Sequence, residues 1–260
     1  MNGLLGAGRL IFAIAMLFFG IEFFVFVTGM VGPPPGPPWS RGVMGLDWLA
    51  CAGFIVAGVC LAAGKMGRWV ATLLGIAMLV YALFRYVPEW VTRLHDPGPW
   101  TVIFEILAMA GGAWILAASF PPDASLPQPS ESLLFRLAVV GRYLIAVSWV
   151  VFAVQHFLYA GYVASLVPAW IPWHLFWAYF VGVAFIAAAL AIAANKMMRL
   201  TGVLLGTMFL LWVVLLHLPR AAAAPRNGDE ATSLIVALAM SGVGFILAGA
   251  FGNRLEGRRV

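Results

Sequence analysis

The sequence has few charged side chains, few cysteines and none of the short motifs of soluble catalysis. Of its 260 residues, 10% are charged, against about 25% in an average soluble domain. No Gly-rich phosphate loop, GxSxG or HExxH pattern occurs. Hydrophobic residues make up 63% of the chain, and the mean hydropathy is +1.00. This composition indicates an all-α polytopic membrane protein whose helices contact the lipid bilayer.

The shortage of cysteine argues against thiol chemistry. The chain has two cysteines, Cys51 and Cys60, and no CxxC pair. If their segment is helical, they lie on opposite faces and about 13 Å apart along the axis, so they cannot form a disulfide. The net charge of +5 comes from basic residues scattered singly among the loops, so nucleic acid is not an expected partner.

Eight stretches are apolar over the ~20 residues that a membrane span needs. The first lacks a cleavage site and has too long an apolar run for a signal peptide, so we expect it to be a span. The predicted spans cover residues 9–30, 43–63, 68–88, 100–119, 137–163, 174–195, 199–218 and 232–251.

The second half of the sequence repeats the first. Gly8-Arg9 matches Gly141-Arg142 at an offset of 133, and from Pro37, which matches Pro168, the offset is 131. Further matches join Phe24 to Phe157, Trp39 to Trp170, Lys65-Met66 to Lys196-Met197, Gly75 to Gly206 and Pro88 to Pro219. We therefore expect a tandem duplication of a four-helix bundle, with units at 1–120 and 134–260 and a Pro/Ser-rich linker at 121–133. Units with an even number of spans should be related by a pseudo-twofold axis along the membrane normal.

The loop charges predict the orientation in a bacterial inner membrane. Basic residues are more frequent on the side of the two termini, which the positive-inside rule assigns to the cytoplasm. That side holds Arg9, Lys65, Arg68, Arg136, Arg142, Lys196, Arg199, Arg254, Arg258 and Arg259, and the other holds Arg41, Arg85, Arg93, Arg220 and Arg226.

Polar side chains within the predicted spans occur near their outer ends. An ionisable group at membrane depth costs several kcal/mol unless it is paired or hydrated, so they predict an outward-opening polar cavity or a salt-bridged cluster. We expect Arg85 to pair with a carboxylate of this set, and Glu22 takes the place that Gln155 has in the second half. The candidate residues are Glu22, Asp47, Arg85, Glu105, Gln155, His156, Tyr159, His174 and His217.

Each of these residues also has a structural interpretation. His156 could form a packing hydrogen bond with Tyr159, one turn later, instead of serving as a ligand or proton relay. His174 and His217 could belong to helix ends. No HxxxH or HxH spacing supports a metal site. Two axial haem ligands from His156 and His217 are the least favoured of these interpretations.

The segment GRYLIAVSWVVFAVQHF and the loop LVPAWIPWHLFW resemble the DoxX family of bacterial membrane proteins. The matching residues are Gly141, Arg142, His156, Phe157, Val167, Pro168 and Pro172. The resemblance implies four helices per unit, hence two fused units. It also implies association with quinol or thiosulfate oxidation, redox stress or assembly of partner proteins. The sequence departs from the family at Phe185 and Phe54, where a glutamate is frequent, and at Phe23, where the histidine is expected.

Three functions remain open from the sequence. The first is a redox-associated protein that meets the quinone pool or a periplasmic electron donor, with His156, Glu22 and Glu105 managing protons beside a quinone. The second is a non-catalytic accessory or assembly subunit that docks a membrane or periplasmic protein. The third is a carrier of a small hydrophobic or anionic molecule.

Overall fold

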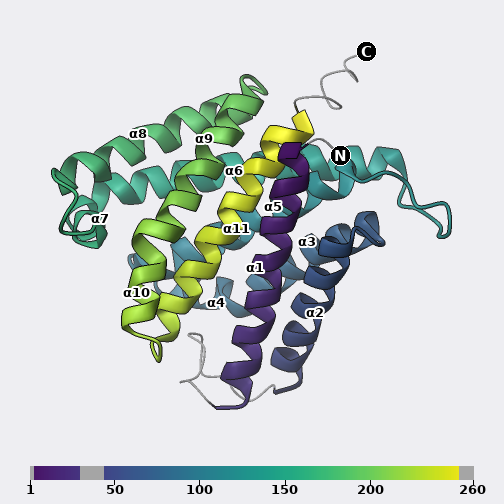
Figure 1. Ribbon diagram of the computed structural model, residues 1–260, viewed down its shortest axis with the longest axis horizontal. Helices are drawn as coiled ribbons and strands as arrows, with labels where there is room; N and C mark the ends of the chain where they lie inside the picture. The colour runs from purple at the N-terminus through teal and green to yellow at the C-terminus, as the bar shows by residue number, and fades with distance from the viewer. Residues whose placement is uncertain (1–2, 30–43, 252–260) are drawn as a thin grey trace.

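The computed structural model describes residues 3–29 and 44–251, and these residues form helices and turns without a strand (Figure 1). Pro37, Trp39, Arg41, Arg254, Arg258 and Arg259 lie outside the described residues. The helices are α1 (Gly3–Val27), α2 (Met44–Ala63), α3 (Gly67–Arg85), α4 (Val87–Thr92), α5 (Pro97–Ser119), α6 (Glu131–Leu158), α7 (Ala160–Leu166), α8 (His174–Ala193), α9 (Met198–Trp212), α10 (Leu218–Ala223) and α11 (Gly228–Phe251).

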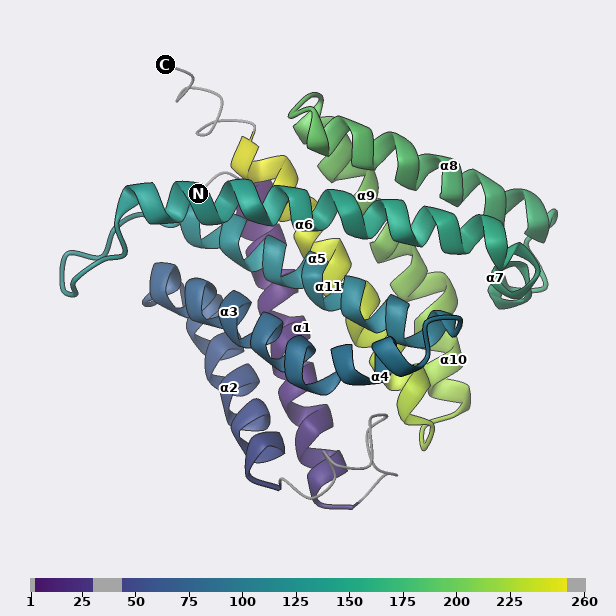
Figure 2. The same cartoon turned by 180° about the vertical axis from the view of Figure 1, so that it is seen from behind.

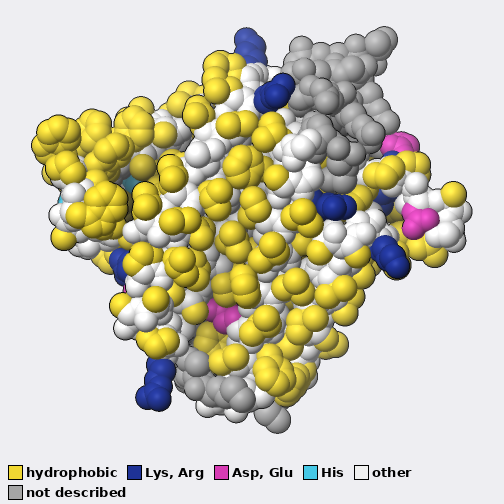
Figure 3. Space-filling view, in the orientation of Figure 1, with side chains coloured by type: hydrophobic (Ala, Val, Ile, Leu, Met, Phe, Trp, Pro, Cys, Tyr) yellow, Lys and Arg dark blue, Asp and Glu magenta, His cyan; other side chains and the backbone are white. Residues whose placement is uncertain are grey.

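Apolar helices of membrane-spanning length dominate the fold. Seven stretches are long and apolar enough to cross a membrane, and α2 carries a shorter apolar stretch, Asp47–Ala63. Figure 3 shows apolar side chains over most of one face, with Lys and Arg near its margins. The prediction of an all-helical membrane protein is therefore confirmed. Both cysteines are free, as expected.

Several expected spans differ at their ends from the predicted ranges. The helix expected from residue 137 begins at Glu131, because the Ser130 hydroxyl accepts a hydrogen bond from the backbone N–H of Leu133. It ends at Leu158, and Tyr159 separates it from α7. The span expected at 199–218 contains a π-helical turn, Val213–His217, just before a proline that has no N–H to continue the α-helical pattern.

The loops fall into two groups at opposite ends of the molecule. In Figure 1, the start of α1, the end of α11, the 120–130 segment and the turns before α3 and α9 lie toward the upper right. The short helices α4, α7 and α10 lie toward the lower left. Figure 2 shows the same separation from behind. We call the second end, which carries α4, α7 and α10, the outer end.

Helix packing runs across the boundary between the two halves of the chain. α1 packs against α2 and against α11, the last helix of the second half. In the same way, α6 packs against α8 and against α5, the last helix of the first half. The pairs α3–α5 and α9–α11 complete the arrangement. Each half is thus a unit of sequence whose first helix is covered by the last helix of the other half.

Glycines allow the closest of these approaches, and they recur at equivalent positions. A Cβ added at Gly8 in α1 would lie 2.9 Å from the carbonyl oxygen of Gly242 in α11. A Cβ added at Gly141 in α6 would lie 2.5 Å from the carbonyl oxygen of Gly111 in α5. The two contacts match at the sequence offsets of 133 and 131. Small residues therefore let the backbones of the two halves touch.

The turns before α3 and α9 share one backbone geometry. Met66 and Met197, 131 residues apart, both have φ 52°, in the left-handed region. Two residues earlier, Gly64 has φ 69° and Asn195 has φ 53°. Left-handed backbone at a residue with a side chain costs about 1–2 kcal/mol, so these turns are held by the helices that they join.

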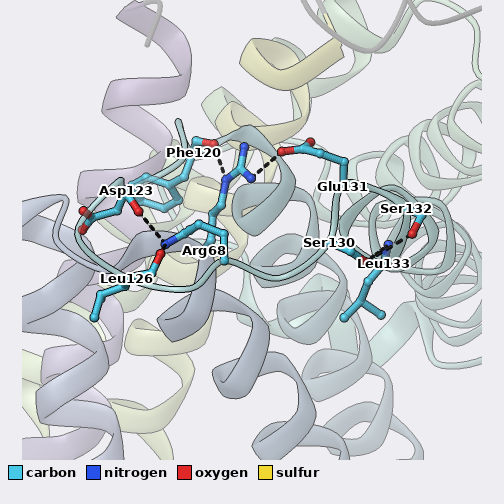
Figure 4. A network of polar contacts seen from close by, with 9 residues as sticks. Arg68, Phe120, Asp123, Leu126, Ser130, Glu131, Ser132 and Leu133 are labelled. Atoms are coloured by element: carbon cyan, nitrogen blue, oxygen red, sulfur yellow. Dashed lines mark hydrogen bonds and ion pairs between the residues drawn. The ribbon is translucent and has the colours of Figure 1, made fainter.

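The linker between the halves is pinned to α3 (Figure 4). Arg68 donates to the Phe120 carbonyl at 3.0 Å and to Glu131 at 2.5 Å, and the Trp69 indole donates to the Pro127 carbonyl at 2.7 Å. Asp123 accepts hydrogen bonds from the N–H and hydroxyl of Ser125, which lower the pKa of its carboxyl. The expected linker is thus held by specific contacts, and its last residues belong to α6.

Candidate functional site

The polar residues singled out from the sequence form separate small groups at the outer ends of their helices. Glu22 lies near the end of α1, Arg85 at the end of α3 and His156 near the end of α6. Glu105 lies in the first half of α5, which starts from that side. We describe the groups in turn, because the structure resolves different partners for each.

Glu22 bonds across the α1–α11 interface. The Thr232 hydroxyl in α11 lies 2.5 Å from Glu22 Oε1 and 2.9 Å from the carbonyl oxygen of Gly228, the first residue of that helix. Asp229 lies close enough to act electrostatically on the Glu22 carboxyl. Among the described residues, no ion pair joins Glu22 to a basic side chain.

Gln155 makes the equivalent contact across the α5–α6 interface. The Thr101 hydroxyl lies 3.2 Å from Gln155 Oε1 and 2.9 Å from the Pro97 carbonyl oxygen, and Gln155 Nε2 donates to that carbonyl at 3.2 Å. Thr101 and Thr232 are 131 residues apart, and each lies four residues after the first residue of its helix. The expected equivalence of Glu22 and Gln155 is therefore seen in their partners as well.

Arg85 lies in a group of tyrosines and carboxylates in the first half. Its guanidinium hydrogen-bonds to the hydroxyl of Tyr81, and its carbon Cζ lies 5.9 Å from the ring centre of Tyr86. The charge of Arg85 acts on Asp47, and that of Glu105 acts on Tyr86. The structure thus places three of the expected residues in one neighbourhood, whereas Glu22 bonds elsewhere. Direct pairing of Arg85 with a carboxylate stays a prediction.

His156 lies among aromatic rings contributed by α6, α8 and α9. Its ring centre lies 5.2 Å from that of Phe185, edge to face, and 6.4 Å from that of Trp212, nearly parallel. Nδ1 lies 2.7 Å from the Phe152 carbonyl oxygen, so Nδ1 carries the proton and Nε2 is the free acceptor. Gly182 in α8 leaves room for the His156 side chain, since a Cβ there would lie 3.3 Å from that of His156.

The same group contains a buried donor without a partner. Trp149 lies seven residues before His156 and hence on the same face of α6. Its side chain is fully buried and stacks on Phe185 with ring centres 5.2 Å apart. Its indole N–H has no hydrogen-bond partner among the described residues. A buried indole N–H usually has a partner, so this group has an unused donor as well as an acceptor.

The remaining candidates lie at helix ends. Tyr159 caps α6 and is 37% exposed, so the expected hydrogen bond with His156 is not formed, because that imidazole bonds to the Phe152 carbonyl instead. His174 is the first residue of α8. His217 ends the π-helical turn, and its buried Nδ1 has no partner among the described residues, although the Arg220–Glu230 pair lies close enough to act on it.

Sequence reasoning missed the residues that complete these groups. Thr101 and Thr232 match at the offset of 131, which could have singled them out, but threonine is common on helices and carries no charge. Trp212 and Phe185 could not be distinguished from the other aromatics of an apolar helix. Their roles depend on how three helices meet.

Comparison of the chain with protein-family models, with curated proteins and with solved structures gives no match. The resemblance to the DoxX family therefore stays a prediction from the motifs in residues 141–172.

Proposed function

We propose that the chain spans a bacterial cytoplasmic membrane eight times as two duplicated four-span units, with both termini in the cytoplasm. α2 has 20 residues, which at 1.5 Å each give about 30 Å, enough for the eighth span. The orientation rests on the excess of basic residues at the end where α1 begins. The recurrence of equivalent contacts supports the duplication.

One contact indicates where the axis between the two units passes. A Cβ added at Gly112 in α5 would lie 2.5 Å from Cγ2 of Val243 in α11. These two residues are equivalent, being 131 residues apart. A residue that touches its own equivalent lies at a twofold axis, as in an isologous interface. The pseudo-twofold axis of the proposed units therefore passes through the α5–α11 crossing.

We further propose that the protein is redox-associated and binds the headgroup of a quinone beside His156. The observation that carries this proposal is the group of Trp149, His156, Phe185 and Trp212, which combines flat aromatic surfaces with an unused donor and an acceptor. A quinone or quinol offers a flat ring for stacking and oxygens for hydrogen bonds. Because these helices are apolar on their outer faces, a lipid-soluble ligand could approach from the bilayer.

The expected role of His156 is to bind the ligand and to accept a proton. In its neutral form with hydrogen on Nδ1, the imidazole accepts a hydrogen bond from a quinol hydroxyl at Nε2. Quinol oxidation releases two protons and two electrons. The electrons would pass to a partner redox protein, so the proposed role is that of a quinone-binding subunit.

A second candidate is the accessory subunit that docks a partner protein. The observation in its favour is the exposed aromatic surface of α7 and the turn before α8. Tyr162, Trp170 and Trp173 are 68%, 69% and 77% exposed. Aromatic side chains are enriched in the cores of protein interfaces, and they are also typical of the membrane–water boundary.

Purification in a mild detergent followed by mass spectrometry of bound quinones and proteins separates the two candidates. The quinone proposal expects near-stoichiometric quinone in the wild type and a loss of about tenfold or more in His156→Phe, which keeps an aromatic ring but removes both nitrogens. The matched control is Phe23→Leu, at the equivalent position of the first half, and should keep its quinone. A stoichiometric protein without quinone would support the accessory role and overturn the first proposal.

A further inference from the structure

The two junctions between the halves differ in one chemical respect. At the α5–α6 junction, Thr101 bonds to Gln155, an amide that is neutral at all physiological pH. At the α1–α11 junction, Thr232 bonds to Glu22, an acid that can ionise. Backbone carbonyls at the start of the last helix, from Pro97 and from Gly228, complete the two sites. The geometry is matched, and only the charge of the side chain from the first helix can change.

Counting hydrogens favours a neutral Glu22 in this arrangement. The Thr232 hydroxyl has one hydrogen and lies within bonding distance of two acceptor oxygens, Glu22 Oε1 at 2.5 Å and the Gly228 carbonyl at 2.9 Å. If the Glu22 acid donates to Thr232, the hydroxyl can donate onward to Gly228, and both contacts are made. An ionised Glu22 has no hydrogen to give, so one of the two contacts then has no hydrogen.

The matched junction shows how a neutral side chain fills the same site. Gln155 brings a donor of its own, which it uses on the Pro97 carbonyl at 3.2 Å, as well as an acceptor for the Thr101 hydroxyl. A protonated glutamate likewise has one donor and one acceptor, whereas a carboxylate has only acceptors. The contacts of Glu22 are therefore those of a side chain that carries a proton.

The charged groups around Glu22 point the same way. From α11, Asp229 faces it with a like charge, and Glu230 is engaged by two hydrogen bonds from Arg220 at 2.9 and 2.6 Å. From α2, the ionisable side chain is Asp47, on which Arg85 acts. Among the described residues, none of these elements offers Glu22 a cation in an ion pair. At membrane depth, an unpaired carboxylate is costly.

We propose that Glu22 is a proton-binding site at the outer end of the α1–α11 junction, and that loss of its proton weakens this junction while leaving the α5–α6 junction unchanged. The ligand is a proton taken from the outer side, where α10 and α11 meet. The consequence is an asymmetric response: of two matched contacts between the halves, one depends on pH. This proposal does not depend on His156 or on a quinone.

Infrared difference spectroscopy of the purified protein tests the site directly. The wild-type spectrum minus that of Glu22→Gln isolates the signal of Glu22 from those of Glu105 and the other carboxyls. We expect the carbonyl band of a protonated acid at mildly acidic pH, its replacement by carboxylate bands as the pH rises, and a fall in the thermal unfolding midpoint over the same pH range. Glu22→Gln should show no such fall.

Two further variants keep the test decisive. Thr232→Val removes the hydroxyl and should shift the Glu22 acid band in frequency. Gln155→Glu should add a second pH-dependent acid band from the α5–α6 junction, and it serves if Glu22→Gln does not insert. Carboxylate bands from Glu22 across the whole pH range, or an unfolding midpoint whose pH dependence is the same with and without Glu22, would overturn the proposal. Either result is independent of the quinone content.

Discussion

Replacing Gly8 by alanine tests whether the two halves are held together by backbone contact. The added Cβ would lie 2.5 Å from the backbone nitrogen of Ile246 and 2.9 Å from the carbonyl oxygen of Gly242, too close for real carbon atoms. Because both atoms belong to the backbone of α11, no side chain can move aside, and the helices must separate. Overpacking of this kind typically costs about 1–3 kcal/mol.

A matched control lies two residues earlier on the same helix. An added Cβ at Gly6 meets nothing within 4 Å, so Gly6→Ala should be neutral or stabilising by up to about 1 kcal/mol, because alanine favours the helix. Gly141→Ala should match Gly8→Ala, since its Cβ would lie 2.5 Å from the Gly111 carbonyl oxygen. Thermal unfolding in a mild detergent measures all three, at about 2–4 °C per kcal/mol. If Gly8→Ala and Gly6→Ala unfold at the same temperature, the proposed contact is not close.

Two other predictions concern the end of the molecule that carries the linker. Arg68→Met removes a buried side chain that bonds to the Phe120 carbonyl and to Glu131, so we expect a loss of about 1–3 kcal/mol and faster cleavage within residues 121–130 by an added protease. An unchanged cleavage rate would show that Arg68 does not pin the linker. Met66→Gly and Met197→Gly relieve left-handed backbone at φ 52° and should each raise the unfolding midpoint by the equivalent of about 1 kcal/mol. A fall at either position would show that packing of the methionine outweighs backbone strain.

The helices could be predicted from the sequence because apolar length alone indicates a membrane span. Breaks at Tyr86 and Tyr159 and the π-helical turn before Leu218 could not, since each depends on how a helix end meets its neighbours. Proline at 88 and 219 gave a partial signal, because it has no N–H to donate. The ends of spans are thus less predictable than their existence.

The candidate site was predicted only as a set of polar residues at one depth. The sequence placed Glu22 and Gln155 at equivalent positions, but their threonine partners come from the last helix of the opposite half, 210 residues from Glu22 and 54 from Gln155. Periodicity describes faces of single helices and carries no information on which helices pack together. Pairing of α1 with α11 had to come from the structure.

The packing of α1 against α11 has a consequence for synthesis of the protein. α1 is the first helix to leave the ribosome, and the helix that covers its Gly8 face is the last. Until residues 228–251 have entered the bilayer, that glycine face is open to lipid or to a chaperone. Assembly of the finished bundle therefore waits for the end of translation, and a ribosome that stalls before α11 leaves the first helix without its closest neighbour.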